Sequence, residues 1–334
     1  MKYSGGATLL FFLLIGLPAI ILPIVLPKTL VHTAEAPLLK RIVGGQEVDL
    51  NLEPRINYQV GVQAGNGRCG GVIINSEWIL SAAHCFFNRV SFMPLVQPNQ
   101  VTVRTGIRFD NTPRAIQSIV MPDSYTAPES PDSVAQDIAL LRLSQPLTFS
   151  ASVAPAALPN ASCGDCEGNG TQYIVSGYGL DECPAIGECS YSNAQPVNNL
   201  RYVNLRYVSR EACVAANPLI TLAIDVICAE GIEPDLQDSC QGDSGGPLVV
   251  DQGAQASPRY KVAGVVSGGT ASTDPLCAVP GQYGIYTGIA VNRAWIDGVI
   301  NATELPSSMT GAACKTTTAF AVGFVFLALV ATTL

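Results

Sequence analysis

One short stretch of the chain, residues 238–247, gathers the residue types that nucleophilic catalysis requires. It reads Asp-Ser-Cys-Gln-Gly-Asp-Ser-Gly-Gly-Pro. A serine hydroxyl is a poor nucleophile at neutral pH, so it needs a neighbouring base and a group that stabilises the developing oxyanion. Gly242 and Gly245 permit a tight turn around Ser244, which would direct the amides of Gly242 and Ser244 at one point. The stretch therefore predicts a serine nucleophile with an oxyanion hole made of two backbone amides.

The N-terminal segment is predicted to be removed from the working protein. Residues 1–36 open with Lys2, continue with an almost wholly apolar run from Ala7 to Leu26, and reach small residues at Ala34 and Ala36. This order is typical of a secretory signal peptide. The apolar run is also long enough for a signal-anchor helix, which is the alternative.

The C-terminal end has a comparable pattern. Residues 302–318 are small and polar, and residues 319–334 are apolar and uncharged. Small residues, a spacer and a terminal apolar tail indicate a GPI-attachment signal, with attachment between Ser307 and Ala313. A membrane helix or a soluble tail is the alternative. Attachment there would also remove Cys314 and leave an even number of cysteines.

Composition restricts the compartment and the partners. The 334-residue chain has a formal net charge of −8, and removal of residues 1–41 and of Lys315 would leave about −12. Nucleic acid is therefore not expected as a partner. Eleven cysteines without the spacing of a paired metal site indicate disulfides in an oxidising compartment. Sequons at Asn160, Asn169 and Asn301 also fit a secreted or extracellular glycoprotein.

The six residues Gly242–Pro247 resemble the nucleophile motif of the trypsin and chymotrypsin family of serine proteases, Gly-Asp-Ser-Gly-Gly-Pro. The resemblance extends over residues 42–301. It implies an all-β fold of two six-stranded antiparallel β-barrels, about 42–158 and about 172–301, followed by a C-terminal helix. It also implies peptide hydrolysis without any metal or organic cofactor, so we expect none.

The resemblance assigns three catalytic roles. His84, in Ser-Ala-Ala-His-Cys, is the implied general base, and the only other histidine is His32 in the predicted signal peptide. Asp137, in Gln-Asp-Ile-Ala-Leu-Leu, is the implied buried carboxylate that orients the imidazole. Ser244 is the implied nucleophile.

Asp238 lies six residues before Ser244, at the position of the pocket floor in trypsin-like members of the family. A carboxylate at the bottom of a narrow pocket pairs best with the terminal cation of Arg or Lys. The chain departs from the family at Gly268, where an aromatic residue is usual, and in the additional residues 270–276, so selectivity beyond the basic residue is not predicted. The remaining pocket residues implied by the resemblance are Ser239, Ser267, Gly269 and Gly284.

A dibasic pair, Lys40-Arg41, precedes Ile42-Val-Gly-Gly. In the family this is the bond whose cleavage activates the zymogen, so residues 37–41 are predicted to be an activation propeptide. The new α-amine of Ile42 would then pair with Asp243, beside the nucleophile. A buried carboxylate at that position is costly until it is paired.

The cysteines follow the family in part. The implied bonds are Cys69–Cys85, Cys213–Cys228 and Cys240–Cys277. Three connectivities are open for the remaining Cys163, Cys166, Cys183 and Cys189; of these we favour Cys163–Cys166 with Cys183–Cys189.

The sequence thus predicts a secreted, zymogen-activated serine endopeptidase, expected to be a monomer, that cleaves after Arg or Lys and is attached to the cell surface if the GPI signal operates. Its expected partners are protein or peptide substrates, and protein protease inhibitors are further candidates. The alternative is a non-catalytic binding protein on the same scaffold. A chymotrypsin-like or elastase-like preference would need an uncharged pocket floor, which Asp238 contradicts.

Overall fold

The structure, a computed structural model, describes residues 39–302 except 41–44, 53–54, 110, 127–135, 180–181, 184–197, 219–221, 233–236 and 272–276. All of them belong to one compact unit, Pro37–Leu334. The predicted signal peptide, the predicted cleavage site at Arg41 and Ile42, and the predicted GPI signal lie outside the described residues. Within the described part of the chain, no helix combines the length and apolarity needed to cross a membrane.

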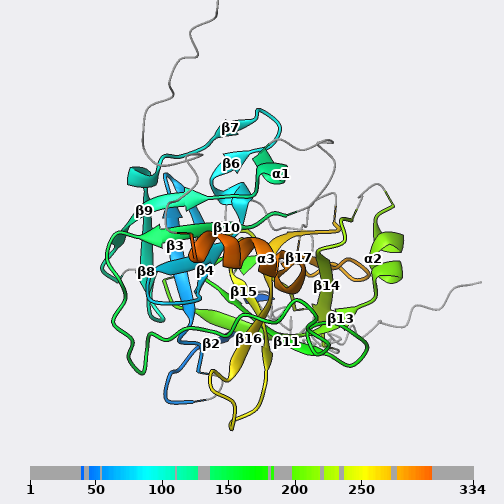
Figure 1. The fold of residues 1–334 in the computed structure, drawn as a ribbon. Coiled ribbons are helices and arrows are strands. Elements are labelled where there is room, and N and C mark those ends of the chain that lie inside the picture. The colour runs from blue at the N-terminus through cyan, green and yellow to red at the C-terminus, as the bar shows by residue number, and fades with distance from the viewer. Residues whose placement is uncertain are drawn as a thin grey trace, which may run out of the picture. The chain divides into compact units, whose positions relative to one another are not determined.

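The N-terminal half forms a closed barrel of six antiparallel strands, coloured blue to green in Figure 1. Along β8 the residues Val101, Val103 and Thr105 are buried, and those between them are half-buried. This is the period-two pattern of a strand with one face on a core. The order around the barrel is β10-β5-β4-β3-β8-β9. The strands are β3 (Gln59–Ala64), β4 (Gly67–Ile73), β5 (Trp78–Ser81), β8 (Val101–Thr105), β9 (Arg114–Val120) and β10 (Ala139–Leu143).

The C-terminal half forms a second antiparallel barrel, in the order β11-β15-β16-β17-β14-β13, which closes because β13 also pairs with β11. The register of β16 against β17 shifts between Val266 and Gly268, and this bulge lies beside the predicted substrate pocket. The strands are β11 (Gln172–Gly177), β13 (Arg201–Val208), β14 (Val226–Gly231), β15 (Pro247–Asp251), β16 (Tyr260–Gly269) and β17 (Gly284–Gly288).

The predicted closing helix is α3 (Ile289–Ile300), which begins directly after β17. It buries Ile289, Ile296 and Val299 on one face, while Trp295 and Ile300 are half-buried against the same cluster. The helix begins at Ile289 because Gly288 is its N-cap and Ile289 already packs into the core. An amphipathic helix is held by this buried face more than by its own propensity.

One hydrophobic cluster joins the two barrels to α3. It contains Val72 and Leu140 from the first barrel, Val249 and Val262 from the second, and Ile289 from the helix, all buried. Buried apolar contacts of this kind hold the two halves together. The fold class predicted from the sequence, two six-stranded antiparallel barrels with a C-terminal helix, is therefore confirmed.

Short elements complete the described chain. Strand β2 extends the second barrel by pairing with β13, β1 pairs with β12, and β6 pairs with β7. Ser209 caps α2 by accepting a hydrogen bond from the Ala212 amide. These elements are β1 (Leu39–Lys40), β2 (Gln46–Glu47), β6 (Phe87–Asn88), β7 (Met93–Pro94), β12 (Glu182–Cys183), α1 (Asp123–Thr126), α2 (Arg210–Ala216), and the 3-10 turns η1 (Ala83–Cys85) and η2 (Pro98–Gln100).

Four disulfides are present among the described residues. Three are the bonds implied by the family resemblance, and the fourth closes the small loop at residues 163–166. The favoured bond between Cys183 and Cys189 involves a residue outside the described ranges. The four bonds are Cys69–Cys85, Cys163–Cys166, Cys213–Cys228 and Cys240–Cys277.

Candidate active site

His84 and Asp137 meet although they lie 53 residues apart in the sequence. His84 sits in the turn η1 directly after β5, and Asp137 precedes β10, which pairs with β5. The imidazole Nδ1 lies 2.6 Å from Asp137 Oδ2, and the His84 amide donates to Asp137 Oδ1 at 2.8 Å. The carboxylate therefore binds both the ring and the backbone of the histidine, which fixes the ring's orientation and its tautomer.

The local electrostatics favour a charged pair. Burial alone would raise the pKa of Asp137, but the charge and hydrogen bonds of His84 and the Ser267 hydroxyl outweigh it and hold that pKa below its ordinary value. Burial lowers the pKa of His84, yet the Asp137 carboxylate more than compensates, and the net shift is upward. The His84 side chain keeps 34% of its surface exposed, so a substrate can reach it. An imidazole with a raised pKa is a stronger base for a serine proton.

The Ser267 hydroxyl donates a hydrogen bond of 2.6 Å to Asp137 Oδ2. Ser267 lines the predicted substrate pocket. The contact with Asp137 was not predicted, because it joins residues 130 positions apart on different barrels. Burial, and then the charge of the Asp137 carboxylate, raise the pKa of the Tyr125 phenol, so Tyr125 remains neutral.

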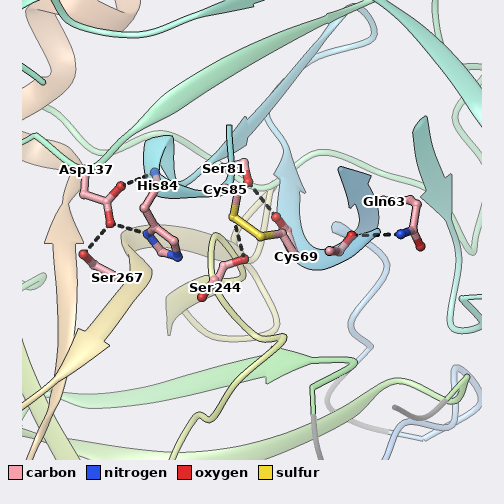
Figure 2. The surroundings of a disulfide bond; sticks show 10 residues. Gln63, Cys69, Ser81, His84, Cys85, Asp137, Ser244 and Ser267 are labelled. Carbon is pink, nitrogen blue, oxygen red and sulfur yellow. Dashed lines mark hydrogen bonds and ion pairs between the residues drawn. A yellow bond between two sulfur atoms is a disulfide. The ribbon is translucent and has the colours of Figure 1, made fainter. Parts of the chain in front are cut away.

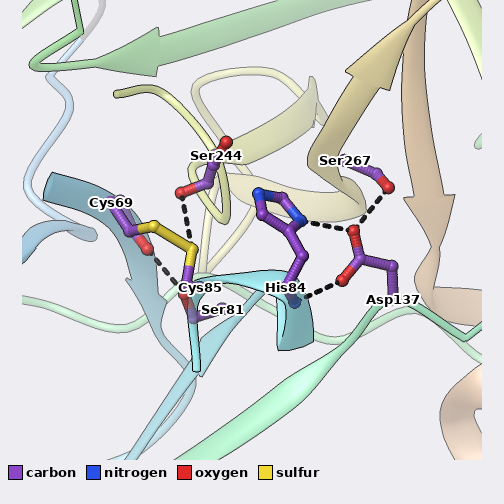
Figure 3. Close-up of polar contacts among 8 residues, drawn as sticks. Cys69, Ser81, His84, Cys85, Asp137, Ser244 and Ser267 are labelled. Atoms are coloured by element: carbon purple, nitrogen blue, oxygen red, sulfur yellow. Dashed lines mark hydrogen bonds and ion pairs between the residues drawn. A yellow bond between two sulfur atoms is a disulfide. The ribbon is translucent and has the colours of Figure 1, made fainter. Parts of the chain in front are cut away.

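Ser244 lies on the other side of the imidazole from Asp137, as Figures 2 and 3 show. The Gly70 amide of β4 donates to the Ser244 carbonyl at 2.7 Å, so a strand of the first barrel holds the turn of the second that carries Ser244. Among the described residues, no hydrogen bond joins the Ser244 hydroxyl to His84. Catalytic hydrogen bonds are often long before substrate binds, so this geometry is compatible with proton transfer.

The turn around Ser244 requires glycine. Gly242 has φ +93° and Gly245 has φ +79°, a left-handed backbone that other residues rarely adopt. A Cβ on Gly245 would lie 2.3 Å from the Ser81 hydroxyl and 2.7 Å from the Gly70 carbonyl. The close approach of the two barrels beside Ser244 therefore excludes any side chain at position 245.

The amides of residues 242–246 divide into two groups. The Asp243 amide donates to the Cys240 carbonyl at 3.0 Å. The Gly245 amide donates to the Val266 carbonyl at 2.8 Å, and the Gly246 amide donates to the Asp243 carbonyl at 2.7 Å. Within the described ranges, the amides of the other two, at positions 242 and 244, have no protein acceptor. Both residues line the same cavity as His84, of about 920 Å³. The two amides predicted to form an oxyanion hole are thus available to a substrate.

Asp243 is fully buried behind this turn. Its carboxylate accepts the Gly179 amide at 2.8 Å and the Cys240 amide at 2.9 Å. Burial raises the pKa of Asp243 to about 7, and the two backbone hydrogen bonds only partly counteract it. A Cβ on Gly177 would lie 1.9 Å from Asp243 Oδ1, so this carboxylate fits only because Gly177 has no side chain. Arg41 and Ile42, the other predicted activation residues, lie outside the described residues.

Asp238 is buried at a cavity of about 260 Å³ that also reaches Ser244. Its Oδ2 accepts the Ala278 amide at 3.2 Å, whereas Oδ1 is buried with no hydrogen-bond partner among the described residues. Burial raises the pKa of Asp238 to about 7. A Cβ on Gly284 would lie 3.0 Å from Asp238 Oδ1, so a side chain there would obstruct the carboxylate. The predicted residues Ser239, Ser267 and Gly269 line the same cavity.

A further buried carboxylate, which the sequence did not indicate, contacts the loop that carries Asp137. Asp225, only 3% exposed, accepts the Gln136 amide at 2.8 Å and the Asn292 side-chain amide at 3.1 Å. Gln136 has φ +54° and directly precedes Asp137. The contact from the second barrel therefore holds a strained backbone conformation next to the carboxylate that orients His84. No sequence motif marks Asp225.

Cys163, Asp165 and Cys166 also lie close together, but the two sulfurs are bonded to each other and offer no thiolate to a metal. Asp165 instead pairs with Lys261, Nζ to Oδ2 at 2.7 Å. The side-chain hydrogen bond and charge of Lys261 lower the pKa of Asp165. This cluster is a structural link between the inter-barrel segment and β16.

Two closed six-stranded barrels with a serine, a histidine and an aspartate gathered where they meet are the arrangement of the double-barrel serine peptidases. The family model described as Trypsin matches residues 42–296. Trypsin-3 of Salmo salar is 32% identical over 78% of this chain and 93% of its own length, and Serine protease 1 of Rattus norvegicus is 34% identical over 78% and 91%. Tryptase of Mus musculus is 32% identical over 84% of this chain and 97% of its own length. The chain belongs to the trypsin family of serine peptidases, whose substrates are proteins or peptides.

Proposed function

We propose that the protein is a serine endopeptidase that cleaves peptide bonds after Arg or Lys. The observation that carries this proposal is the Asp238 carboxylate, with Oδ1 buried and unpartnered in the described structure, at a cavity that extends to Ser244. A buried charge without a partner is costly, and a guanidinium or ammonium of a substrate would supply one with good geometry. An uncharged substrate side chain would leave that carboxylate unpaired.

In the proposed reaction Ser244 attacks the carbonyl after the basic residue. His84 accepts the hydroxyl proton at Nε2, and Asp137 stabilises the imidazolium that forms at Nδ1. The amides of Gly242 and Ser244 bind the developing oxyanion. His84 then returns the proton to the leaving amine, an acyl group remains on Ser244, and water releases it by the same route in reverse.

We further propose that the chain is made as a zymogen and is activated by cleavage after Arg41. The support is Asp243, whose buried carboxylate, with its pKa raised to about 7, contacts the turn that carries the oxyanion-hole amides. A new ammonium at Ile42 would stabilise the charged carboxylate and so fix that turn. The four disulfides fit a protein that folds in an oxidising, extracellular compartment. Secretion as a monomeric glycoprotein through residues 1–36, and GPI attachment through the C-terminal tail, complete the proposal.

The test is hydrolysis of small anilide substrates that carry Arg, Lys, Phe or Ala before the cleaved bond, measured before and after cleavage at Arg41. We expect activity on Arg and Lys that appears only after cleavage, is lost in Ser244→Ala, and changes its preference in Asp238→Asn. The second candidate, a non-catalytic binding protein, is favoured if correctly cleaved protein hydrolyses none of the four. Release from cells by a phosphatidylinositol-specific phospholipase tests the GPI anchor separately.

A further inference from the structure

A second cavity meets the Asp238 cavity at the nucleophile. The larger cavity, of about 920 Å³, shares Gln241 and Ser244 with the smaller one and otherwise extends along the Cys69–Cys85 disulfide. In the proposed function the basic side chain before the cut enters the Asp238 cavity. The substrate residues after the cut therefore follow the larger cavity, which we call the leaving-side groove. Its lining includes Arg68, Leu95, Gln100 and Gly179.

Strand β4 sets the distance from the nucleophile to Arg68. The Gly70 amide is bonded to the Ser244 carbonyl, and Arg68 is two residues earlier on the same strand. Successive residues of an extended chain advance by about 3.3 Å, so Arg68 lies about 7 Å along the strand from Gly70. The second substrate residue after the cut is displaced from the reacting carbonyl by a similar length. Arg68 is thus placed to meet that residue.

The Phe109 ring supports the guanidinium of Arg68. It stacks on the buried Phe109 ring, 4.3 Å from the ring centroid, and Arg104 lies over the same ring at 5.3 Å. Burial, and then the charge of Arg104, lower the pKa of Arg68. Two guanidinium groups therefore lie over one aromatic ring, which concentrates positive charge at Arg68.

The charge of the groove contrasts with that of the whole chain. The chain carries a net charge of −8, yet Arg68 and His84 are the basic residues in the groove lining and no described lining residue is an Asp or Glu. Arg68 is half-buried, which makes an ion pair there stronger than one on the open surface. A guanidinium also offers a carboxylate two parallel hydrogen bonds.

We propose that the leaving-side groove selects Asp or Glu as the second residue after the cut bond, and that Arg68 determines this preference. The inference rests on the proposed function, because it needs a serine peptidase that cleaves after a basic residue. The preferred substrates would therefore carry a basic residue before the cut bond and an acidic residue as the second residue after it.

The experiment uses the full secreted chain, activated by cleavage at Arg41. Internally quenched peptides have Arg before the cut and Glu, Gln or Lys as the second residue after it. An Arg anilide, which has no amino-acid residue after the cut, serves as the internal reference. The variants are Arg68→Gln, Arg68→Glu, and Arg114→Gln as a matched control, since Arg114 is an exposed arginine of the same barrel outside the groove.

We expect kcat/KM for the Glu peptide to exceed that for the Gln peptide roughly tenfold, the value of one well-placed, half-buried ion pair. Arg68→Gln should abolish this ratio, Arg68→Glu should favour the Lys peptide, and Arg114→Gln should leave the ratio unchanged. Arg114→Gln should hydrolyse the anilide at the wild-type rate, and the peptide rates of each Arg68 variant are compared with its own anilide rate. Equal rates on the Glu and Lys peptides with normal anilide hydrolysis, or a Glu preference that survives in Arg68→Gln, would overturn the inference alone. Absence of anilide hydrolysis by the wild type would instead refute the proposed function.

Discussion

Cleavage after Arg41 is expected to change how the stability of the protein depends on pH. In the uncleaved chain the buried Asp243 carboxyl has a pKa of about 7, well above its ordinary value of 3.8, because burial opposes its charged form. The folded state therefore keeps a proton on this group that the unfolded state has already released. The contribution of Asp243 to the free energy of unfolding is therefore fully present below the ordinary pKa of the group, and it is lost as the pH rises to about 7.

The size of the effect follows from the shift. Each pH unit between the two pKa values costs about 1.4 kcal/mol, so raising the pH from 5 to 8 should remove about 3 kcal/mol of unfolding free energy from the uncleaved chain through Asp243. After cleavage, a paired ammonium at Ile42 would lower the pKa of Asp243 and remove this loss. Asp238, whose pKa is also raised to about 7, contributes with the same sign in both forms.

The measurement is urea unfolding, followed by tryptophan fluorescence at pH 5 and pH 8, in a Ser244→Ala background that prevents self-cleavage. Uncleaved protein should lose more stability over this range than cleaved protein, by about 3 kcal/mol. Asp243→Asn should remove the difference, while Asp49→Asn, an exposed control, should keep it. The reasoning is refuted if both forms lose equal stability, or if the difference persists in Asp243→Asn.

Two further substitutions test the residues that position Asp137. Ser267→Ala removes a donor to this carboxylate and should lower kcat for the Arg anilide about tenfold, since a hydrogen bond to a charged group is worth about 1.5 kcal/mol. An unchanged kcat would exclude a positioning role for Ser267. Asp225→Ala removes the acceptor of the Gln136 amide and should lower kcat by a similar factor with little change in KM. Asp225→Asn keeps an acceptor oxygen and should therefore retain much of the wild-type kcat. Equal kcat in Ala and Asn variants at position 225 would contradict a positioning role.

Local sequence signals predicted much of this molecule. The glycines around Ser244 predicted a tight turn, and the structure shows positive φ at Gly242 and Gly245. The family resemblance predicted two six-stranded antiparallel barrels, and the structure contains both. The small-loop bond Cys163–Cys166 was favoured among several open pairings, and the structure contains it.

Contacts across the barrels could not be predicted in the same way. Asp225 bonds to Gln136 over 89 positions, and Ser267 bonds to Asp137 over 130. Neither contact leaves a periodic pattern or a motif, because each depends on how the two barrels pack against each other. An isolated buried acid in a sequence looks like any loop acid until its neighbours are known.

The hydrophobic cluster shared by the two barrels and α3 affects how the enzyme loses activity. Val72, Val249 and Ile289 pack together, so neither barrel can separate without exposing the apolar surface of the other. The two halves are therefore expected to melt in a single cooperative transition, and the proposed catalytic site at their junction would be lost in the same transition. The apolar contacts that bring Ser244 close to His84 also make the two barrels one folding unit.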